Sequence, residues 1–378
     1  LHVLTHSFPT RRSSDLPGPS TLPTEVLQRA ASEMLDWRGM GVSVMEISHR
    51  GKEFMEVAAK AKQDFRDLLH IPDRYEILFL QGGAIAENSI VPMNLLKSGA
   101  KANYLITGQW SARSAREAER YGEVHVVANG VDAQGRYLSL PPRNTWRIDR
   151  QASYLHLCIN ETIDGLAFNG LVERGDEAHQ APVDMPVVAD VSSTILSEPL
   201  DVSQFGVLYG GAQKNIGPAG LTFVIIRKDL LGSAHPLCPS AFNYKIVSEN
   251  DSMYNTPPTY GIYLAGLVFE WLIAQGGVEA IARVNEQKAR LMYELIDSSD
   301  FYYNKVEPDY RSKMNICFFL ADENLNGLFL KESLDAGLFA LKGHRVLGGM
   351  RASIYNAMPL AGVQALVEFM KGFEKRHG

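Results

Sequence analysis

The stretch G-G-A-Q-K-N-I-G-P-A-G, residues 210–220, places Lys214 in a glycine-rich turn between two apolar runs. The first run ends with residues 207–209 and the second covers residues 221–226, and both have the composition of buried strands. An ammonium group that is buried without a partner is costly, and burial lowers the pKa of a lysine. This is the setting of a lysine that forms a Schiff base with an aldehyde cofactor. The alternative is a turn lysine exposed to solvent.

Short β-type runs alternate with helical stretches on both sides of this turn. We expect strands at residues 75–80, 102–107, 123–128, 154–159, 186–189, 206–209 and 221–226. We expect helices at about residues 23–35, 52–69, 111–120, 260–274 and 276–296. Strands that alternate with helices predict an α/β protein in which both faces of a mostly parallel sheet are covered.

The C-terminal part of the chain has a different pattern. Its expected strands lie at residues 315–320 and 351–355, and its expected helices at about residues 328–336 and 360–373. A chain of 378 residues is long enough for two domains, since a domain typically has about 100–200 residues. We therefore interpret residues 17–284 as a large domain and residues 285–378 as a smaller α+β domain.

The composition is that of an ordinary globular protein, with 46% hydrophobic and 21% charged residues. The formal net charge is -6 and there is no basic block, so neither nucleic acid nor an anionic membrane is expected as a partner. No apolar run approaches the ~18 residues of a membrane-spanning helix. Cys158, Cys238 and Cys317 are far apart. They indicate free thiols in a reducing, cytoplasmic compartment, with no disulfide and no metal site.

The N-terminus does not look like part of the fold. Residues 6–16 read H-S-F-P-T-R-R-S-S-D-L, which resembles a translated sequencing adapter. Arg11 and Arg12 would suit a targeting signal, but no apolar stretch follows them. We interpret residues 1–16 as a cloning or assembly scar and leave them out of the fold.

Unusual polar groups follow the predicted strands. Ligands of parallel sheets bind beyond the carboxyl ends of the strands, so these groups are expected to converge on one site. They are Gly82, Gly83, Trp110, Thr162, Asp164, Asp190 and Lys214.

Each of these groups has both a functional and an ordinary interpretation. Asp190 is suited to keeping a pyridine nitrogen protonated, but it also suits the N-cap of the next segment. Trp110 is suited to stacking on a planar ring, or to packing in a core. The turn at Gly82 and Gly83 precedes a helix and offers N–H groups to a phosphate, although a Gly-Gly turn alone is weak evidence. Thr162 is suited to bonding a ring hydroxyl or to capping a turn.

A second set of residues is cationic and lies in turns beside apolar runs. It consists of His49, Arg50, His344, Arg345 and Arg351. Arginine forks match carboxylate and phosphate groups, so several of them indicate a substrate with more than one anionic group. The alternative is a set of surface salt bridges, which contribute little.

Five motifs together resemble the phosphoserine aminotransferase family, and the resemblance runs from about residue 17 to the C-terminus. They are N-E-T-I-D-G (160–165), A-D-V-S-S-T-I-L-S-E-P (189–199), G-A-Q-K-N-I-G-P-A-G (211–220), Y-N-T-P-P-T (254–259) and G-H-R-V-L-G-G-M-R-A-S-I-Y-N (343–356). This family belongs to the class V aminotransferases of fold type I. The resemblance implies a seven-stranded, mostly parallel sheet in the large domain, pyridoxal 5′-phosphate as cofactor, and a homodimer with shared active sites.

The resemblance also implies the reaction. It is the transfer of the amino group between L-glutamate and 3-phosphohydroxypyruvate, which gives O-phospho-L-serine and 2-oxoglutarate in L-serine biosynthesis. In this family 4-phosphohydroxythreonine, an intermediate of pyridoxine biosynthesis, is a possible second substrate.

The family's cofactor residues match positions of this chain. By resemblance Lys214 is the Schiff-base lysine and proton shuttle, Asp190 the partner of the pyridinium, Trp110 the stacking residue and Thr162 the partner of the ring hydroxyl. The backbone amides of Ala84 and Ile85, together with Gln213, match phosphate ligands. Asn255 and Thr256 resemble residues that reach the phosphate from the other subunit.

The cationic residues match the family's substrate ligands. By resemblance Arg351 takes the α-carboxylate. His49 and Arg50, with His344 and Arg345 from the partner chain, take the substrate phosphate or the distal carboxylate of glutamate.

The chain departs from the family pattern in the phosphate loop. Glu87 and Asn88 stand where Gln-Phe is usual, and Ile85 stands where some relatives have arginine. The nearest alternative is another class V enzyme, such as a serine–glyoxylate aminotransferase or a cysteine desulfurase. A desulfurase needs a cysteine on a mobile loop, whereas Cys158 and Cys317 lie in apolar runs. A cofactor-binding protein without catalysis is a third alternative, and the Lys214–Asp190 pair argues against it.

Overall fold

The structure is a computed structural model that describes residues 18–97, 99–170 and 172–378. The predicted scar at residues 1–16 lies outside these described residues. Within them no single helix has the length and apolar composition needed to cross a membrane. One pair of helices, α6 (Thr259–Ala274) and α7 (Gly277–Asp297), passes that test only jointly, across an 82° bend.

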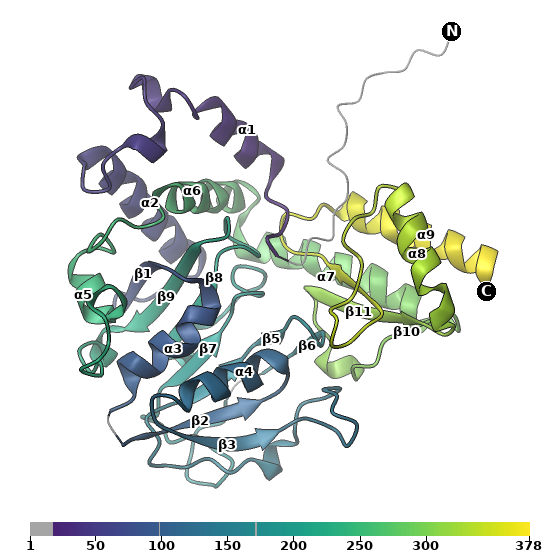
Figure 1. The fold of residues 1–378 in the computed structure, drawn as a ribbon, viewed down its shortest axis with the longest axis horizontal. Coiled ribbons are helices and arrows are strands. Elements are labelled where there is room, and N and C mark those ends of the chain that lie inside the picture. Colours follow the sequence, from purple (N-terminus) through teal and green to yellow (C-terminus); the bar gives the residue numbers. More distant parts are fainter. Residues whose placement is uncertain (1–17, 98, 171) are drawn as a thin grey trace.

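A seven-stranded sheet lies at the centre of the fold, in the order β1-β9-β8-β7-β4-β2-β3 (Figure 1). Its strands are β1 (Tyr75–Gln81), β2 (Lys101–Ile106), β3 (Glu123–Asn129), β4 (Leu155–Cys158), β7 (Val187–Asp190), β8 (Val207–Gly211) and β9 (Leu221–Arg227). Neighbouring strands are parallel except at β9, which is antiparallel to both β1 and β8. The predicted α/β class, with a mostly parallel seven-stranded sheet, is confirmed.

Helices cover both faces of this sheet (Figure 1). They are α1 (Thr24–Ser32), α2 (Lys52–Leu68), α3 (Gly83–Leu95), α4 (Gln109–Ala118), α5 (Tyr244–Glu249) and α6 (Thr259–Ala274). Side chains alternate along β9: Phe223 belongs to the core under α2 and α6, while Val224 belongs to the core under α3, α4 and α5. On the first face Phe65 stacks on Phe269 with ring centroids 4.9 Å apart, which joins α2 to α6.

A second hydrophobic core lies in the C-terminal part of the chain. It is built on a three-stranded antiparallel sheet with three helices: β10 (Tyr302–Tyr303), β11 (Asn315–Leu320), β12 (Met350–Ser353), α7 (Gly277–Asp297), α8 (Asn326–Asp335) and α9 (Leu360–His377). Helix α7 joins the two cores, because Ile281 packs in the first and Ala289 in the second. The proposed boundary between residues 284 and 285 therefore falls inside one continuous helix, and the division into two domains stays a prediction.

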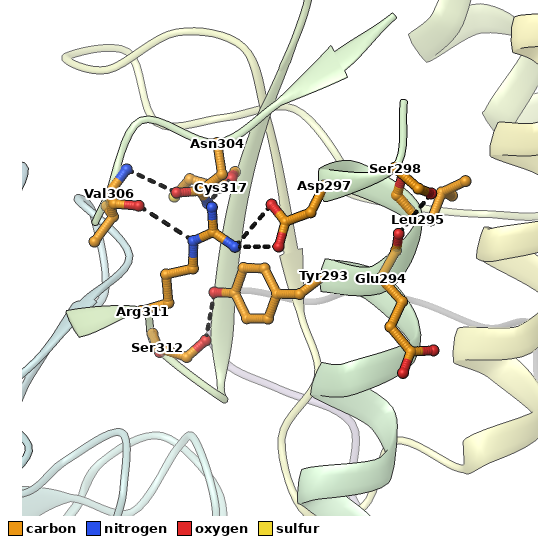
Figure 2. A network of polar contacts seen from close by, with 10 residues as sticks. All are labelled: Tyr293, Glu294, Leu295, Asp297, Ser298, Asn304, Val306, Arg311, Ser312 and Cys317. Carbon is orange, nitrogen blue, oxygen red and sulfur yellow. Dashed lines mark hydrogen bonds and ion pairs between the residues drawn. The ribbon is translucent and has the colours of Figure 1, made fainter. Parts of the chain in front are cut away.

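The C-terminal half of α7 holds the segment that leads into β11 (Figure 2). Arg311 Nη1 donates to both carboxylate oxygens of Asp297, at 2.9 and 2.7 Å. The Tyr293 hydroxyl donates to the carbonyl oxygen of Ser312 at 2.7 Å. The backbone N–H of Ser312 in turn donates to the carbonyl oxygen of Gly165, at 2.9 Å. This network joins α7 to the turn that follows Thr162.

Candidate active site

A cavity of about 160 Å³ lies at the edge of the central sheet where β1, β2, β4, β7 and β8 end. Its lining includes seven of the predicted cofactor residues: Ala84, Ile85, Trp110, Thr162, Asp190, Gln213 and Lys214. These positions are up to 130 residues apart in the chain and meet because each follows a strand of one sheet. The expected convergence is confirmed for these groups. Asp164, which was expected among them, does not line the cavity.

Lys214 is partly buried and faces this cavity. Its Nζ donates to Thr162 Oγ1 at 2.7 Å and lies 6.0 Å from the centre of the Trp110 ring. Desolvation lowers the pKa of Lys214, and the negative charge of Asp190 opposes this effect. The interpretation as a lysine in an exposed turn is therefore wrong. A lysine whose pKa is lowered has more of the neutral amine that a nucleophile or a base requires.

Asp190 is the last residue of β7 and has a partly exposed side chain. Its Oδ1 accepts hydrogen bonds from the backbone N–H of Ser192 at 2.9 Å and from the Ser192 hydroxyl at 2.6 Å. Asp190 can therefore both cap the segment that follows β7 and bind a ligand. One carboxylate oxygen shapes the turn, and the other has no hydrogen-bond partner within the described residues.

Trp110 is held by a residue that the sequence did not single out, Glu161. The hairpin formed by β5 (Asn160–Glu161) and β6 (Leu166–Ala167) places this buried carboxylate at the start of α4. Glu161 accepts from the backbone N–H groups of Trp110 at 2.7 Å and Ser111 at 2.9 Å. Burial raises the pKa of Glu161, whereas these hydrogen bonds lower it. The only sequence signal for this cap was its place beside Thr162.

The approach of Glu161 to α4 is close enough to require a glycine. A Cβ atom at Gly108 would lie 2.3 Å from Glu161 Cδ. Any larger residue at this position would displace the carboxylate from the first turn of α4. Trp110 Nε1 is buried and has no hydrogen-bond partner within the described residues, so the indole ring is positioned by packing and by the helix.

The start of α3 forms a cradle of backbone N–H groups. Gly82 and Gly83 have φ values of 110° and 70°, which favour glycine. A Cβ atom at Gly82 would lie 2.6 Å from the Cβ of Ala86. The first N–H groups of the helix, including those of Ala84 and Ile85, have no partner within the helix, and the positive end of the helix dipole lies here. Such a terminus is suited to a phosphate group.

Glu87 points away from this cradle. The Tyr244 hydroxyl donates to Glu87 Oε2 at 2.6 Å, and the side chain is fully buried outside the cavity lining. Burial raises the pKa of Glu87 to about 8, so the carboxyl group is mostly neutral at pH 7. Asn88 does line the cavity, and its Oδ1 accepts from the hydroxyls of Ser114 and Tyr209. The departure from the family pattern therefore puts no carboxylate in the phosphate cradle.

Arg351 is a buried cation close to the cavity. Its side chain is on β12, and the residue is 7% exposed. Nη1 donates to the carbonyl oxygen of Thr162 at 3.0 Å, and Arg351 makes no ion pair with any of residues 18–97, 99–170 and 172–378. A buried guanidinium without a carboxylate is costly, which indicates that an anionic ligand completes this site.

The other cationic residues form two groups outside the cavity lining. Burial lowers the pKa of His344, and the positive charges of Arg351 and Arg345 of the same chain are close enough to lower it further. Arg50 instead lies beside the segment that contains Asn255 and Thr256.

The contacts of this second group are with the backbone before Asn255. Arg50 Nη2 donates to the carbonyl oxygen of Tyr254 at 3.0 Å, whereas Asn255 and Thr256 are exposed. His49 Nε2 is buried without a partner within the described residues. The predicted substrate-binding residues therefore form two groups. His344 and Arg345 belong with Arg351, and Arg50 lies beside Asn255.

The residues of the cavity fit a pyridine ring that carries an aldehyde and a phosphate. Lys214 offers an amine, Asp190 a carboxylate and Trp110 an aromatic face, while the start of α3 offers an anion cradle. The sequence profile of the family described as "Aminotransferase class-V" matches residues 14–366. The phosphoserine aminotransferase of Ralstonia nicotianae is 57% identical over 362 residues, which are 95% of this chain and 94% of the relative. The chain belongs to the phosphoserine aminotransferase family.

Further comparisons agree with this family. The phosphoserine aminotransferase of Janthinobacterium is 54% identical over 365 residues, covering 96% of this chain and 98% of the relative. A solved phosphoserine aminotransferase from Bacillus circulans has a TM-score of 0.90 and 42% identity, covering 96% of this chain and 98% of that one. One from Trichomonas vaginalis, bound to pyridoxal phosphate, has a TM-score of 0.89 and 39% identity, covering 96% and 100%. As a phosphoserine aminotransferase, the chain uses pyridoxal 5′-phosphate as its cofactor.

The alternatives within the fold are not favoured. A ureidoglycine–glyoxylate aminotransferase has a TM-score of 0.75 at 15% identity, which shows a shared fold alone. A desulfurase would need a reactive thiolate, but burial raises the pKa values of Cys158 and Cys317. The Cys317 thiol instead donates to the carbonyl oxygen of Ile163.

Proposed function

We propose that this chain transfers an amino group from L-glutamate to 3-phosphohydroxypyruvate, giving O-phospho-L-serine and 2-oxoglutarate, as a cytoplasmic homodimer. The observation that carries this proposal is Arg351. Its guanidinium is buried, has no carboxylate partner among the described residues, and shares Thr162 as a hydrogen-bond partner with Lys214. Every substrate and product of this reaction has an α-carboxylate that can complete the site.

The distal anion is bound by the two remaining cationic groups. His344 and Arg345 lie on the same side as Arg351 of their own chain. We assign His49 and Arg50 to the active site of the other subunit, together with Asn255 and Thr256, because Arg50 bonds the backbone just before these two residues. This reverses the assignment that the family resemblance suggests for the two pairs. A pocket of flexible cations from two chains accepts either a phosphate or a γ-carboxylate.

The chemistry divides between the cofactor and the chain. When bound, pyridoxal phosphate supplies a conjugated ring that stabilises the electron pair left at the substrate Cα. Lys214 Nζ would anchor the cofactor and then, as a neutral amine, would move the proton between the substrate Cα and C4′ of the cofactor. Asp190 would keep the ring nitrogen protonated, and Trp110 would offer an aromatic face to the ring. The N–H groups at the start of α3 hold the phosphate of the cofactor.

The first prediction concerns the distal anion. In single-turnover reactions of the holoenzyme, phosphoserine reacts with a kcat/KM about 10²–10⁴ higher than that of serine or alanine. The reason is that two charge-assisted hydrogen bonds contribute about 1.5–3 kcal/mol each. Arg345→Ala reduces this preference, whereas Lys331→Ala, at an exposed position on α8, leaves it unchanged. Equal rates for serine and phosphoserine would refute the phosphate assignments, and a colourless reconstituted protein would refute the cofactor site.

The second prediction concerns the division of residues between subunits. Arg50→Ala and Lys214→Ala proteins, each nearly inactive, are unfolded together and refolded as mixed dimers. If Arg50 acts across the interface, each mixed dimer has one intact site, and about a quarter of the wild-type activity returns. Arg345→Ala mixed with Lys214→Ala restores nothing, because Arg345 and Lys214 of one chain serve the same site, so one site of the mixed dimer lacks Arg345 and the other lacks Lys214. If activity returns with Arg345→Ala and not with Arg50→Ala, the assignment implied by the family resemblance is correct and ours is wrong.

A further inference from the structure

Lys288 is a fully buried lysine in the middle of α7. Its Nζ donates three hydrogen bonds to backbone carbonyl oxygens, those of Ile354 at 3.0 Å, Tyr355 at 2.8 Å and Met358 at 3.0 Å. No carboxylate of the described residues pairs with it, and burial lowers the pKa of Lys288 to about 7. Three acceptors match the three N–H donors of one ammonium group. Lys288 therefore holds the turn that follows β12.

This turn contacts the loop that carries the cofactor lysine. The backbone N–H of Asn356 donates to Asn215 Oδ1 at 3.1 Å, and Asn215 directly follows Lys214. The side chain of Asn356 is fixed in turn by Asn285 of α7, whose Nδ2 donates to Asn356 Oδ1 at 2.9 Å. Asn285 and Lys288, one helical turn apart on α7, thus both bond the turn after β12 and hold it in contact with the loop that carries Lys214.

The same turn is continuous with the strand that carries Arg351. Arg351 bonds the carbonyl oxygen of Thr162, and Lys214 bonds the hydroxyl of the same threonine. The contacts therefore form a closed ring. Lys288 bonds the turn 354–358, and this turn bonds Asn215 beside Lys214. Lys214 and Arg351 both bond Thr162, and β12 leads from Arg351 back to the turn. Figure 2 shows that Tyr293 of α7 also bonds Ser312, in the segment before β11. Ser312 in turn bonds Gly165, in the turn after Thr162, so α7 supports this turn as well as the turn after β12.

We propose that Lys288 is a positioning residue, which sets the spacing between Lys214 and Arg351 by holding the turn 354–358. It touches neither cofactor nor substrate. The proposal rests on the roles of Lys214 and Arg351 in the proposed function. Arg351 fixes the substrate carboxylate and Lys214 must reach the proton on the adjacent Cα, so a shift of about 1 Å between them can cost about 10² in rate.

The test replaces Lys288, which donates to the turn 354–358, and Asn356, which lies within that turn. Lys288→Met keeps an unbranched side chain of similar length but loses the three donors. Asn356→Ala keeps Lys288 but removes the side-chain hydrogen bonds with Asn285 and Leu196 that fix the residue whose backbone N–H donates to Asn215. In both holoenzymes we expect a kcat for phosphoserine that is lower by about 10–10², and a higher KM. The pKa at which the visible band of the bound cofactor titrates also shifts from the wild-type value. The double variant is no worse than the poorer single variant, because both changes act through one turn.

Tyr302→Phe is the control for a merely structural effect. It removes one buried hydrogen bond, from the Tyr302 hydroxyl to the carbonyl oxygen of Met370, in the same C-terminal core. We expect a lower melting temperature with unchanged kcat, KM and cofactor titration. The proposal is overturned if Lys288→Met behaves like this control, or if the double variant loses the sum of the two single effects.

Two further outcomes are distinguishable. If Lys288→Met does not fold, Asn356→Ala decides alone, and wild-type constants in that variant overturn the proposal. If the wild-type holoenzyme fails to turn over phosphoserine, the proposed function has failed, independently of any difference between the variants.

Discussion

Lys214→Ala lowers kcat with phosphoserine by about 10⁴-fold or more, because it removes both the anchor of the cofactor and the base at Cα. The loss is chemical, since Lys214 makes one side-chain hydrogen bond, to Thr162, within the described residues. Stopped-flow absorption of the holoenzyme checks it: the visible band of the bound cofactor changes position, and the spectral change on adding phosphoserine becomes slow.

A small primary amine added to Lys214→Ala restores part of the rate, because it supplies the missing base in the vacated space. Lys331→Ala, with an exposed lysine on α8, keeps the wild-type spectrum and rate. If Lys214→Ala keeps the wild-type spectrum and turns over within tenfold of the wild type, another residue is the cofactor lysine.

Asp190→Asn lowers kcat by about 10²–10⁴, the range of a positioned acid or base. Asparagine keeps an acceptor for the two hydrogen bonds from Ser192, so the turn persists. What disappears is the negative charge that keeps the ring nitrogen protonated. Because the charge of Asp190 also favours the ammonium form of Lys214, its removal lowers the pKa of Lys214 further. Amine-specific acylation of the apoenzyme as a function of pH measures that shift.

Asp201→Asn is a matched control for the turn itself. Asp201 Oδ1 accepts from the backbone N–H and the hydroxyl of Ser203 at 2.9 and 2.6 Å, the same geometry as the Asp190–Ser192 turn but outside the cavity. Asp201→Asn is expected to leave kcat unchanged. An Asp190→Asn enzyme that keeps its kcat as well would remove Asp190 from the catalytic site.

Most strands of the central sheet and the long helices were predictable from local patterns, whereas the short elements α5, β5, β6 and β10 were not. Strand β9 and strand β1 are apolar runs bounded by turn residues, and helix α7 begins directly after Gly276, as expected. These patterns are local, because a strand or helix must bury one side of itself wherever it packs. Convergence of the cofactor residues also followed, since parallel strands end at one edge.

Other features depend on contacts that no local pattern encodes. Glu161 caps α4 from a different hairpin, and Lys288 binds a turn more than 60 residues further along the chain. Arg351 and Arg50 look alike in the sequence. Only the packing shows that Arg351 lies beside Thr162 and that Arg50 lies beside Tyr254.

The sequence by itself determined the α/β class and the order of the strands along the chain, and it predicted the group of residues that meets around Lys214. The tertiary structure alone decided the direction of the pKa shifts of buried groups, the absence of a carboxylate partner for Arg351 within the described residues, and the hydrogen bonds from Lys288 of α7 to the turn after β12. The physical reason is range. Propensity and periodicity act over a few residues, whereas desolvation and charge depend on which distant segments exclude water from one another.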